Sequence, residues 1–580
     1  MNEEEPKVRV TFLGATRCTT GSCYYIEAAE KKFLVDCGLH VENPDSLDRH
    51  EVPSEIDPAT LDFVILTEPS ISRCALLPKI HSEGFTKVAY CRKSLRELFE
   101  LCLLESGENE RQRELWFKEK GERKGVGHCT ALYDQYQAAR SLELLEEVDD
   151  GCLIPTDDGK VAFQFHGSRD STSIELIVKE GGKEERLVFF SDEERDCSWL
   201  LPGKPSASYL FLLGKRSKVR EKTQSPWEEK LIEAMQSCNE ENAPLLIPCS
   251  MGRTMKLLLP KLLESWKAGK LTCPSVVLDS PLASRYIEKF KLKGMDARVE
   301  RSESIALNEA SGPRAIISGD SSCNKGRIQH HLKHNLWSRG SKVIFFEEQA
   351  FGTIGRRLLD GCSSIQLFGE RIRVMAEVLD FSSSFEGFEN KGIESFLEGL
   401  DSFDKIFLQG GEEDILFDLE DFLEDKWPGS TYVPNFKEEL DLSKTEGIKE
   451  LSTVREAPDL ESSNVEQDLQ VELEAFERSV ELSREKLSDL VTALEAWAKQ
   501  NSDNTEAVRG CAIVLERIVA NLTALGMEGV EGTERTIVKL AQELAKDSPK
   551  GSIEAISALR NVRSTLEEAS DSADSLLGAF

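Results

Sequence analysis

The chain has 580 residues, too many for one hydrophobic core, which predicts about three or four structural units. Hydrophobic residues make up 40% and charged residues 30% of the sequence, as in ordinary globular proteins. No apolar run approaches the roughly 18 residues of a membrane-spanning helix, and the first residues are acidic, unlike a secretory signal. We therefore expect an intracellular protein without a membrane segment, cytoplasmic or, in a eukaryote, nuclear.

Charge is the first constraint on function. The 72 Lys and Arg residues stand against 104 Asp and Glu residues, and the net charge of −32 repels a polyanion such as RNA at long range. RNA binding would need a local basic groove, and acidity that only keeps the protein in solution is the plainer interpretation. The fifteen cysteines are scattered without repeated spacing, which favours reduced core thiols over a disulfide framework.

The first third of the chain is rich in predicted strands. Apolar runs at 8–13, 22–27 and 32–36 are separated by glycine-containing turns, and a run at 63–67 precedes a helix-like stretch at 76–81. Alternation of buried strands with helices predicts a layered α/β architecture.

A second α/β rhythm follows within 206–350. Apolar runs at 244–248, 275–279, 315–319 and 342–346 are each followed by a turn and, mostly, by an amphipathic helix. This pattern predicts a small parallel-sheet domain. Further along, we predict a strand at 405–409 and a helix at 415–426.

The last quarter of the chain changes character. Ser, Glu, Asp and Lys dominate about 440–468, which predicts a polar linker. From 469 to 497, apolar residues recur at alternating spacings of four and three, as in a coiled coil or bundle helix, and further amphipathic stretches follow. We predict a helical bundle or coiled-coil domain at 469–580, either closed on itself or paired with another copy or a partner.

Several segments, in order between residues 8 and 437, carry a family resemblance. They are Phe12–Tyr24, Phe33–Leu39, Ile247–Arg253, Leu278–Ala283, Ala306–Glu309, Gly326–Leu336 and Gln349–Leu359. Together they resemble the metallo-β-lactamase/β-CASP family of RNA-processing nucleases, which contains cleavage and polyadenylation endonucleases and bacterial and archaeal ribonucleases.

The resemblance implies an α/β fold with a definite layout. A metallo-β-lactamase αββα sandwich would comprise 1–205 and 351–439, and a β-CASP α/β domain would be inserted at 206–350. The polar linker and the all-α C-terminal domain would follow.

The resemblance also implies two zinc ions, which activate a water and stabilise the attacked phosphate. The family's His-x-His-x-Asp-His motif falls here on Glu68, Ser70, Ser72 and Arg73. Serine is a poor neutral ligand, and arginine places a fixed positive charge where a dication should lie. We therefore expect no catalytic residue at these positions and no metal cofactor.

Other family positions are changed as well. Asp192 matches the family's bridging aspartate, whereas Ser384 and Gly410 stand where two of its histidines are expected. The segment that carries another ligand histidine is degraded around His166, which is either a displaced ligand or an ordinary hydrogen-bonding residue. A rebuilt one-metal site drawn from Glu68, His166, Asp192 or Glu412 is the alternative to loss of the metal.

The densest cationic segment of the chain comprises Lys325, Arg327, His330, His331 and Lys333. In relatives this loop and helix border the substrate cleft, so the resemblance implies phosphate or RNA contact. The alternative is a helix whose Leu332 and Leu336 face inward while its polar residues face water.

Arg253 and Ser280 each follow a predicted strand. Helix N-terminal amides and a guanidinium at such a place can hold a phosphate together. Retention of the turn for structural reasons is an equal alternative for both residues.

Family segments that are recognisable in the sequence, but lack the metal ligands, favour a non-catalytic β-CASP pseudoenzyme. It would act as a partner or scaffold subunit, bound to an active β-CASP paralogue or to itself, with RNA as a candidate ligand. The alternatives are a residual metal-dependent RNA hydrolase with a rebuilt site and a homo-oligomeric structural protein assembled through the C-terminal helices.

Overall fold

The computed structural model describes residues 8–41, 52–116, 118, 130–167, 172–180, 183–191, 207–213, 227–250, 253–269, 275–292, 295–310, 312–382, 397–400 and 402–453. These residues belong to one compact unit that ends at Thr453. The predicted helices of 469–580 and the linker residues from 454 onward lie outside the described residues.

The first sheet has seven strands in the order β22-β1-β2-β3-β4-β5-β6. Its strands are β1 (Val8–Phe12), β2 (Tyr24–Ala28), β3 (Lys31–Val35), β4 (Phe63–Leu66), β5 (Val88–Arg92), β6 (Leu145–Val148) and β22 (Glu439–Asp441). β1 to β3 form an antiparallel meander, and β3 to β6 run parallel. The strands predicted in this region are therefore present.

The second sheet also has seven strands, in the order β21-β20-β11-β10-β9-β8-β7. They are β7 (Ile154–Pro155), β8 (Val161–His166), β9 (Ser173–Glu180), β10 (Lys183–Ser191), β11 (Tyr209–Leu213), β20 (Lys405–Gln409) and β21 (Thr431–Tyr432). β11 is buried along its whole length and pairs in parallel with β10 and β20.

These two sheets pack face to face through an aromatic core. The ring of Tyr24 on β2 meets the ring of Phe189 on β10 at a centroid distance of 5.0 Å, and Phe189 stacks on Phe211 at 4.4 Å. Inward-facing residues of both sheets belong to the same buried cluster. Burial of large aromatic rings dominates the energy of such a core.

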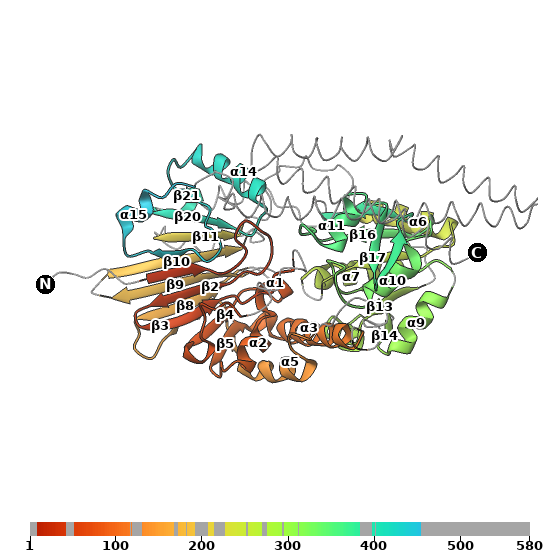
Figure 1. Ribbon diagram of the computed structural model, residues 1–580, viewed down its shortest axis with the longest axis horizontal. Coiled ribbons are helices and arrows are strands. Elements are labelled where there is room, and N and C mark those ends of the chain that lie inside the picture. Colours follow the sequence, from red (N-terminus) through yellow and green to blue (C-terminus); the bar gives the residue numbers. More distant parts are fainter. Residues whose placement is uncertain are drawn as a thin grey trace, which may run out of the picture. The chain divides into compact units, whose positions relative to one another are not determined.

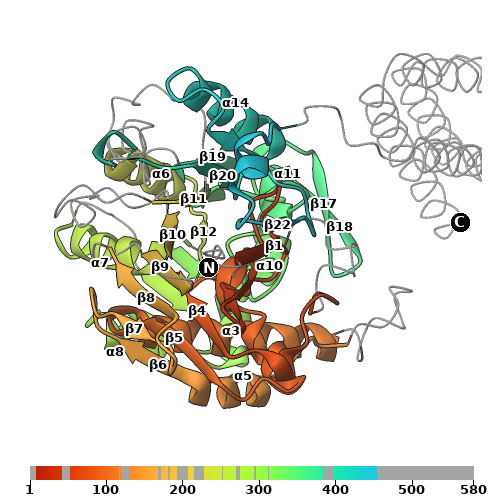
Figure 2. The same ribbon diagram turned by 90° about the vertical axis from the view of Figure 1, so that its left-hand side faces the viewer.

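Helices cover the outer faces of both sheets (Figure 1). The helices near the first sheet are α1 (Ile71–Cys74), α2 (Leu77–Ser82), α3 (Arg96–Trp116) and α5 (Gln135–Ser141), and those near the second are α14 (Glu413–Glu424) and α15 (Thr445–Lys449). The perpendicular view in Figure 2 likewise places α5 and α14 on opposite sides of the sheets. The result is the four-layer αββα arrangement that the resemblance implies.

The third sheet has six strands, all parallel, in the order β14-β13-β15-β12-β16-β19. They are β12 (Leu245–Pro248), β13 (Val276–Asp279), β14 (Asp296–Arg298), β15 (Ala315–Ser318), β16 (Lys342–Phe345) and β19 (Glu377–Asp380). Its helices are α6 (Trp227–Glu240), α7 (Arg253–Lys267), α8 (Ala283–Lys289), α9 (Arg301–Glu309), α10 (Ile328–Asn335) and α11 (Ile354–Leu359). A hairpin of β17 (Ser364–Leu367) and β18 (Glu370–Arg373) lies beside it in sequence.

Both predicted boundaries of the inserted domain differ from the structure. β11 lies in the second sheet although it falls within the predicted 206–350, because its apolar run has two parallel neighbours there. β19 lies beyond residue 350 but pairs with β16 at the edge of the third sheet, where its polar residues are exposed and its apolar residues half-buried. The local sequence patterns of β11 and β19 do not show which strands they pair with.

The predicted start of the polar linker, residue 440, is also wrong. β22 pairs with β1, and Leu440, Leu442 and Ile448 are buried in the core between the first two sheets. An edge strand and a short helix that bury one face have a polar composition, so they resemble a linker in sequence. In the ranges described, no helix combines the length and apolar character needed to cross a membrane.

Candidate acidic cleft

A cavity of about 150 Å³ lies where loops of the first and third sheets meet. It is lined by Thr19, Thr20, Val41, Glu68, Pro69, Ser70, Ile71, Ser72, Ser250, Asp320, Ser321, Ser322, Glu347, Glu348, Gln349 and Ala350. Most of these loops leave the carboxyl ends of parallel strands: β4 in the first sheet, and β12, β15 and β16 in the third. Crevices at such strand ends are the usual binding places in α/β folds.

The charge of this acidic cleft is one-sided. Glu68, Asp320, Glu347 and Glu348 supply carboxylates, and hydroxyl groups supply most of the remaining polar surface. Among the described residues that line it there is no Lys, Arg or His. The cleft therefore repels phosphate and attracts cationic groups.

Arg73 is buried next to the acidic cleft and contacts Glu68, which lines it. It belongs to α1 and is only 3% exposed. Its Nη1 lies 3.6 Å from Asp36 Oδ2, and its Nε lies 3.1 Å from Glu68 Oε2. Nη1 also donates to Thr67 Oγ1 at 3.1 Å, so one guanidinium connects the loop after β3 with the loop after β4.

Asp36 is the carboxylate beneath this guanidinium. Burial raises the pKa of Asp36 to about 6, although the Arg73 charge and hydrogen bonds from Thr67 oppose the shift. Thr67 donates to Asp36 Oδ1 from its backbone N at 2.9 Å and from its hydroxyl at 2.8 Å. The carboxylate, the hydroxyl and the guanidinium thus form one buried polar network.

The two serines at family ligand positions lie beside this network. Ser70 precedes α1 and its hydroxyl is 3.2 Å from that of Ser72. Both serines line the acidic cleft, so Glu68, Ser70, Ser72 and Arg73 are brought together as the resemblance implies. In the part of the chain that the structure describes, no three His, Cys, Asp or Glu side chains gather in a metal-binding group.

A buried acid that the sequence did not single out lies below the acidic cleft. Glu105 on α3 accepts a hydrogen bond from the Ser280 hydroxyl, at 3.3 Å, across 175 positions of sequence. Burial raises the pKa of Glu105 to about 8, with Ser280 and Arg327 opposing the shift. Ser280, predicted as a phosphate contact, is itself buried and engaged in this link.

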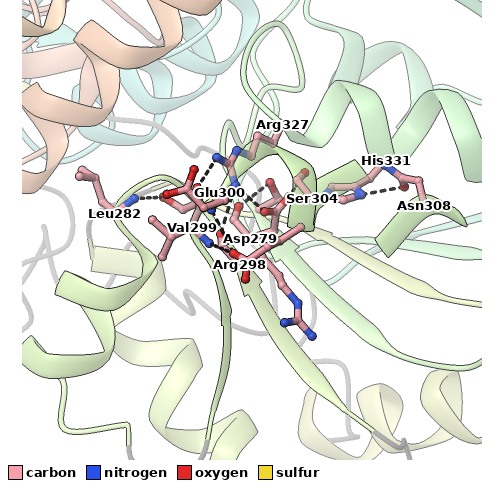
Figure 3. A network of polar contacts seen from close by, with 12 residues as sticks. Asp279, Leu282, Arg298, Val299, Glu300, Ser304, Asn308, Arg327 and His331 are labelled. Atoms are coloured by element: carbon pink, nitrogen blue, oxygen red, sulfur yellow. Dashed lines mark hydrogen bonds and ion pairs between the residues drawn. The ribbon is translucent and has the colours of Figure 1, made fainter. Parts of the chain in front are cut away.

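The predicted cationic patch is divided between the interior and the surface. Arg327 and His331 point into the third-sheet domain, where both contact Asp279 at the end of β13 (Figure 3). Arg327 donates to Asp279 at 2.7 Å, and His331 Nε2 lies 2.6 Å from the same carboxylate. Ser304 donates to Asp279 at 2.6 Å, which completes the Asp279 network.

Arg327 and His331, two of the residues predicted to contact phosphate or RNA, are therefore buried and held by Asp279. Ile328, His331, Leu332 and Asn335 are the buried residues of α10, at the i, i+3, i+4, i+7 spacing of one helical face. A histidine at such a position turns inward because a buried carboxylate satisfies it. The prediction that Leu332 and Leu336 face inward is confirmed.

The other cationic residues of the segment have acidic or aromatic neighbours. Lys325 pairs with the buried Glu110 of α3, and Lys333 Nζ lies 2.6 Å from Glu370. The His330 ring stacks on Phe368 with centroids 4.3 Å apart. None of the three lines the acidic cleft.

Two of the weaker metal candidates, His166 and Glu412, do not line the acidic cleft. His166, at the end of β8, lies 3.2 Å from Glu175 of β9 as a hydrogen-bonding neighbour. Glu412 precedes α14 and accepts from Arg356 at 3.2 Å, which joins α14 to α11. Gly410 adopts a φ of +78° and its backbone N donates to Ala15.

The side chains at three predicted positions are not described. Asp192 and Ser384 lie outside the described residues. Arg253 begins α7, but its side chain is not described.

Comparison with known proteins agrees with this layout. The family model described as the Beta-Casp domain matches residues 255–358. "Ribonuclease TTHA0252" of Thermus thermophilus is 24% identical over 438 residues, which cover 71% of this chain and 95% of that protein. "Transcription termination factor FttA" of Methanocaldococcus jannaschii is 23% identical over 472 residues, covering 74% of this chain and 70% of that protein. Residues 255–358 therefore match the β-CASP domain, and about 71 to 74% of the chain is similar to proteins named as a ribonuclease and a transcription termination factor.

Proposed function

We propose that this β-CASP protein is a non-catalytic subunit that acts as a partner or scaffold in RNA processing. The observation that carries the proposal is the buried Arg73 guanidinium at a family ligand position, in contact with Asp36 and Glu68. Arg73 supplies these two carboxylates with the positive charge that a metal ion would otherwise supply.

The residues present do not fit the family's two zinc ions. Two unit charges about 4 Å apart interact by about 4 kcal/mol in a partly buried site, so a dication beside Arg73 would meet repulsion of about 8 kcal/mol. Ser70 and Ser72 offer neutral hydroxyl groups in place of imidazole or carboxylate. We therefore derive no hydrolytic step through a metal.

We include RNA in the proposal because of the names of two similar proteins. One relative is named a ribonuclease and another a transcription termination factor. The carboxylates of the acidic cleft oppose a phosphate backbone there, so we place RNA contact outside this cleft.

The direct test of lost hydrolysis is an RNA cleavage assay on the full chain. Labelled RNA of mixed sequence is incubated with purified protein in Zn²⁺ or Mn²⁺, with a chelator-treated sample as the control. We expect the same cleavage rate with and without chelator, at the level of buffer alone. Metal-dependent cleavage that disappears when Glu68→Gln is introduced would instead support the residual hydrolase that the relatives favour.

The proposed partner role is tested separately, by pull-down and light scattering. We propose an active β-CASP paralogue or a second copy as the partner, with the C-terminal residues 469–580 as the contacting region. A native pull-down that returns neither RNA nor a second protein, from a chain that light scattering shows to be monomeric, would contradict this role. Self-association that persists after removal of 466–580 would rule out assembly through the C-terminal region.

A further inference from the structure

Two loops at the edge of the acidic cleft bring a thiol and an imidazole together. Cys18 lies between β1 and β2, and His40 lies in the loop that follows β3. The backbone N of Val41 donates to Thr20 Oγ1 at 3.0 Å, which ties the loops. Gly21, with a φ of +82°, permits their close approach, because a Cβ there would lie 3.3 Å from the His40 backbone.

The contact places a base beside a nucleophile. Cys18 Sγ is 3.9 Å from His40 Nδ1 and 3.7 Å from the carbonyl oxygen of Thr20. His40 is 7% exposed, whereas Cys18 is only half-buried, so the thiol is the accessible member of the pair. With its proton on Nε2, the imidazole can accept the thiol proton at Nδ1.

We propose that Cys18 is a thiol–disulfide exchange site, with His40 as its base, that reacts with small cationic disulfides. The Cys18 proton passes to His40, and Sγ attacks one sulfur of the disulfide. The disulfide S–S bond breaks, a mixed disulfide forms on Cys18, and the departing sulfur takes up a proton as a thiol. The site does not depend on the loss of RNA hydrolysis.

The preference for a cation follows from the surroundings. Thr19 and Thr20, the next residues after Cys18, line the acidic cleft, which holds four carboxylates, one of them (Glu68) paired with the buried Arg73. The neighbouring cation, Arg17, is held by Glu413 at 2.5 Å, so its charge is compensated. An incoming disulfide therefore meets a field that favours positive groups.

The experiment follows modification of the intact, full-length protein by mass spectrometry of its cysteine peptides. Cystamine, a cationic disulfide, is compared with the anionic 3,3′-dithiodipropionate, and the exposed Cys152 serves as the internal reference thiol. We expect cystamine to modify Cys18 at least about tenfold faster than the anionic reagent does, and faster than it modifies Cys152. His40→Gln should slow Cys18 and leave Cys152 unchanged.

Two outcomes would overturn the proposal. One is a wild-type Cys18 that reacts no faster with cystamine than with 3,3′-dithiodipropionate, or no faster with cystamine than Cys152 does. The other is a folded His40→Gln variant with an unchanged rate at Cys18. If His40→Gln unfolds, the buried Cys37 and Cys91 become reactive and reveal it, and the wild-type comparison still decides.

Discussion

Replacement of Arg73 by alanine is expected to lower the free energy of unfolding by about 3 to 5 kcal/mol. The change leaves the buried carboxylate of Asp36 and that of Glu68 facing each other without their shared cation. Unfolding of the full chain in urea, followed by circular dichroism, measures the loss. Arg73→Lys should lie in between, because it keeps the charge but not the fork of donors.

The Arg73→Ala deficit should also depend on pH. The pKa of Asp36 is already raised to about 6, by burial, with Arg73 still opposing the shift. Without Arg73 the pKa of Asp36 rises above about 6, so the deficit is largest at alkaline pH, shrinks as the pH falls towards about 6, and stays constant below it. A deficit that does not change between alkaline pH and about pH 6 would contradict this origin.

The matched control is Arg9→Ala. Arg9 is 52% exposed and contacts Glu27 and Glu439 at 3.5 Å, so its loss should cost at most about 1 kcal/mol. If Arg73→Ala were no more destabilising than Arg9→Ala, the carboxylates would not depend on Arg73. The charge of Arg73 would then be no reason to exclude a metal ion beside Asp36 and Glu68.

Asp279→Asn is expected to have the second large effect, a loss of about 3 kcal/mol at neutral pH. Asparagine keeps the shape but leaves Arg327, 8% exposed in its side chain, without a counter-charge. Burial alone would raise the pKa of Asp279, but hydrogen bonds and charge from His331, with Ser304 and Arg327, hold it below its usual value.

The pH dependence of the Asp279–Arg327 pair follows from the lowered pKa of Asp279. The lowered pKa means that Asp279 stabilises the fold above its unfolded value, about pH 3.9, and that this stabilisation is lost on further acidification. The difference in free energy of unfolding between wild type and Asp279→Asn should therefore become smaller at acid pH.

The control is Asp296→Asn, at a half-buried pair with Arg298, where we expect a small effect. Equal losses of stability for the two variants would refute the assigned role of Asp279.

Short apolar runs made much of the fold predictable. β12, β13, β15 and β16 are buried at every position, and each contains a run of at least three apolar residues in the sequence. β11 has the same appearance but belongs to another sheet, because its partners are distant in sequence. Local patterns identify strands, whereas sheet membership depends on pairing over hundreds of residues.

The sequence predicted which residues belong to the site, but not the contacts that they make. The sequence placed a positive charge at a ligand position, yet only the fold shows Arg73 between Asp36 and Glu68. Likewise His331 has the polarity of a surface residue, and its buried partner Asp279 lies 52 positions away. Glu105 carried no motif at all, since its burial arises from contact with Ser280 of the third-sheet domain.

The most direct test of the central claim is the metal content of the purified full chain. The protein is incubated with Zn²⁺ or Mn²⁺, desalted and analysed by mass spectrometry of the elements. We expect far less than one ion per chain, with the same value for Asp36→Asn and Glu68→Gln. One or two ions per chain, displaced by those substitutions, would contradict it.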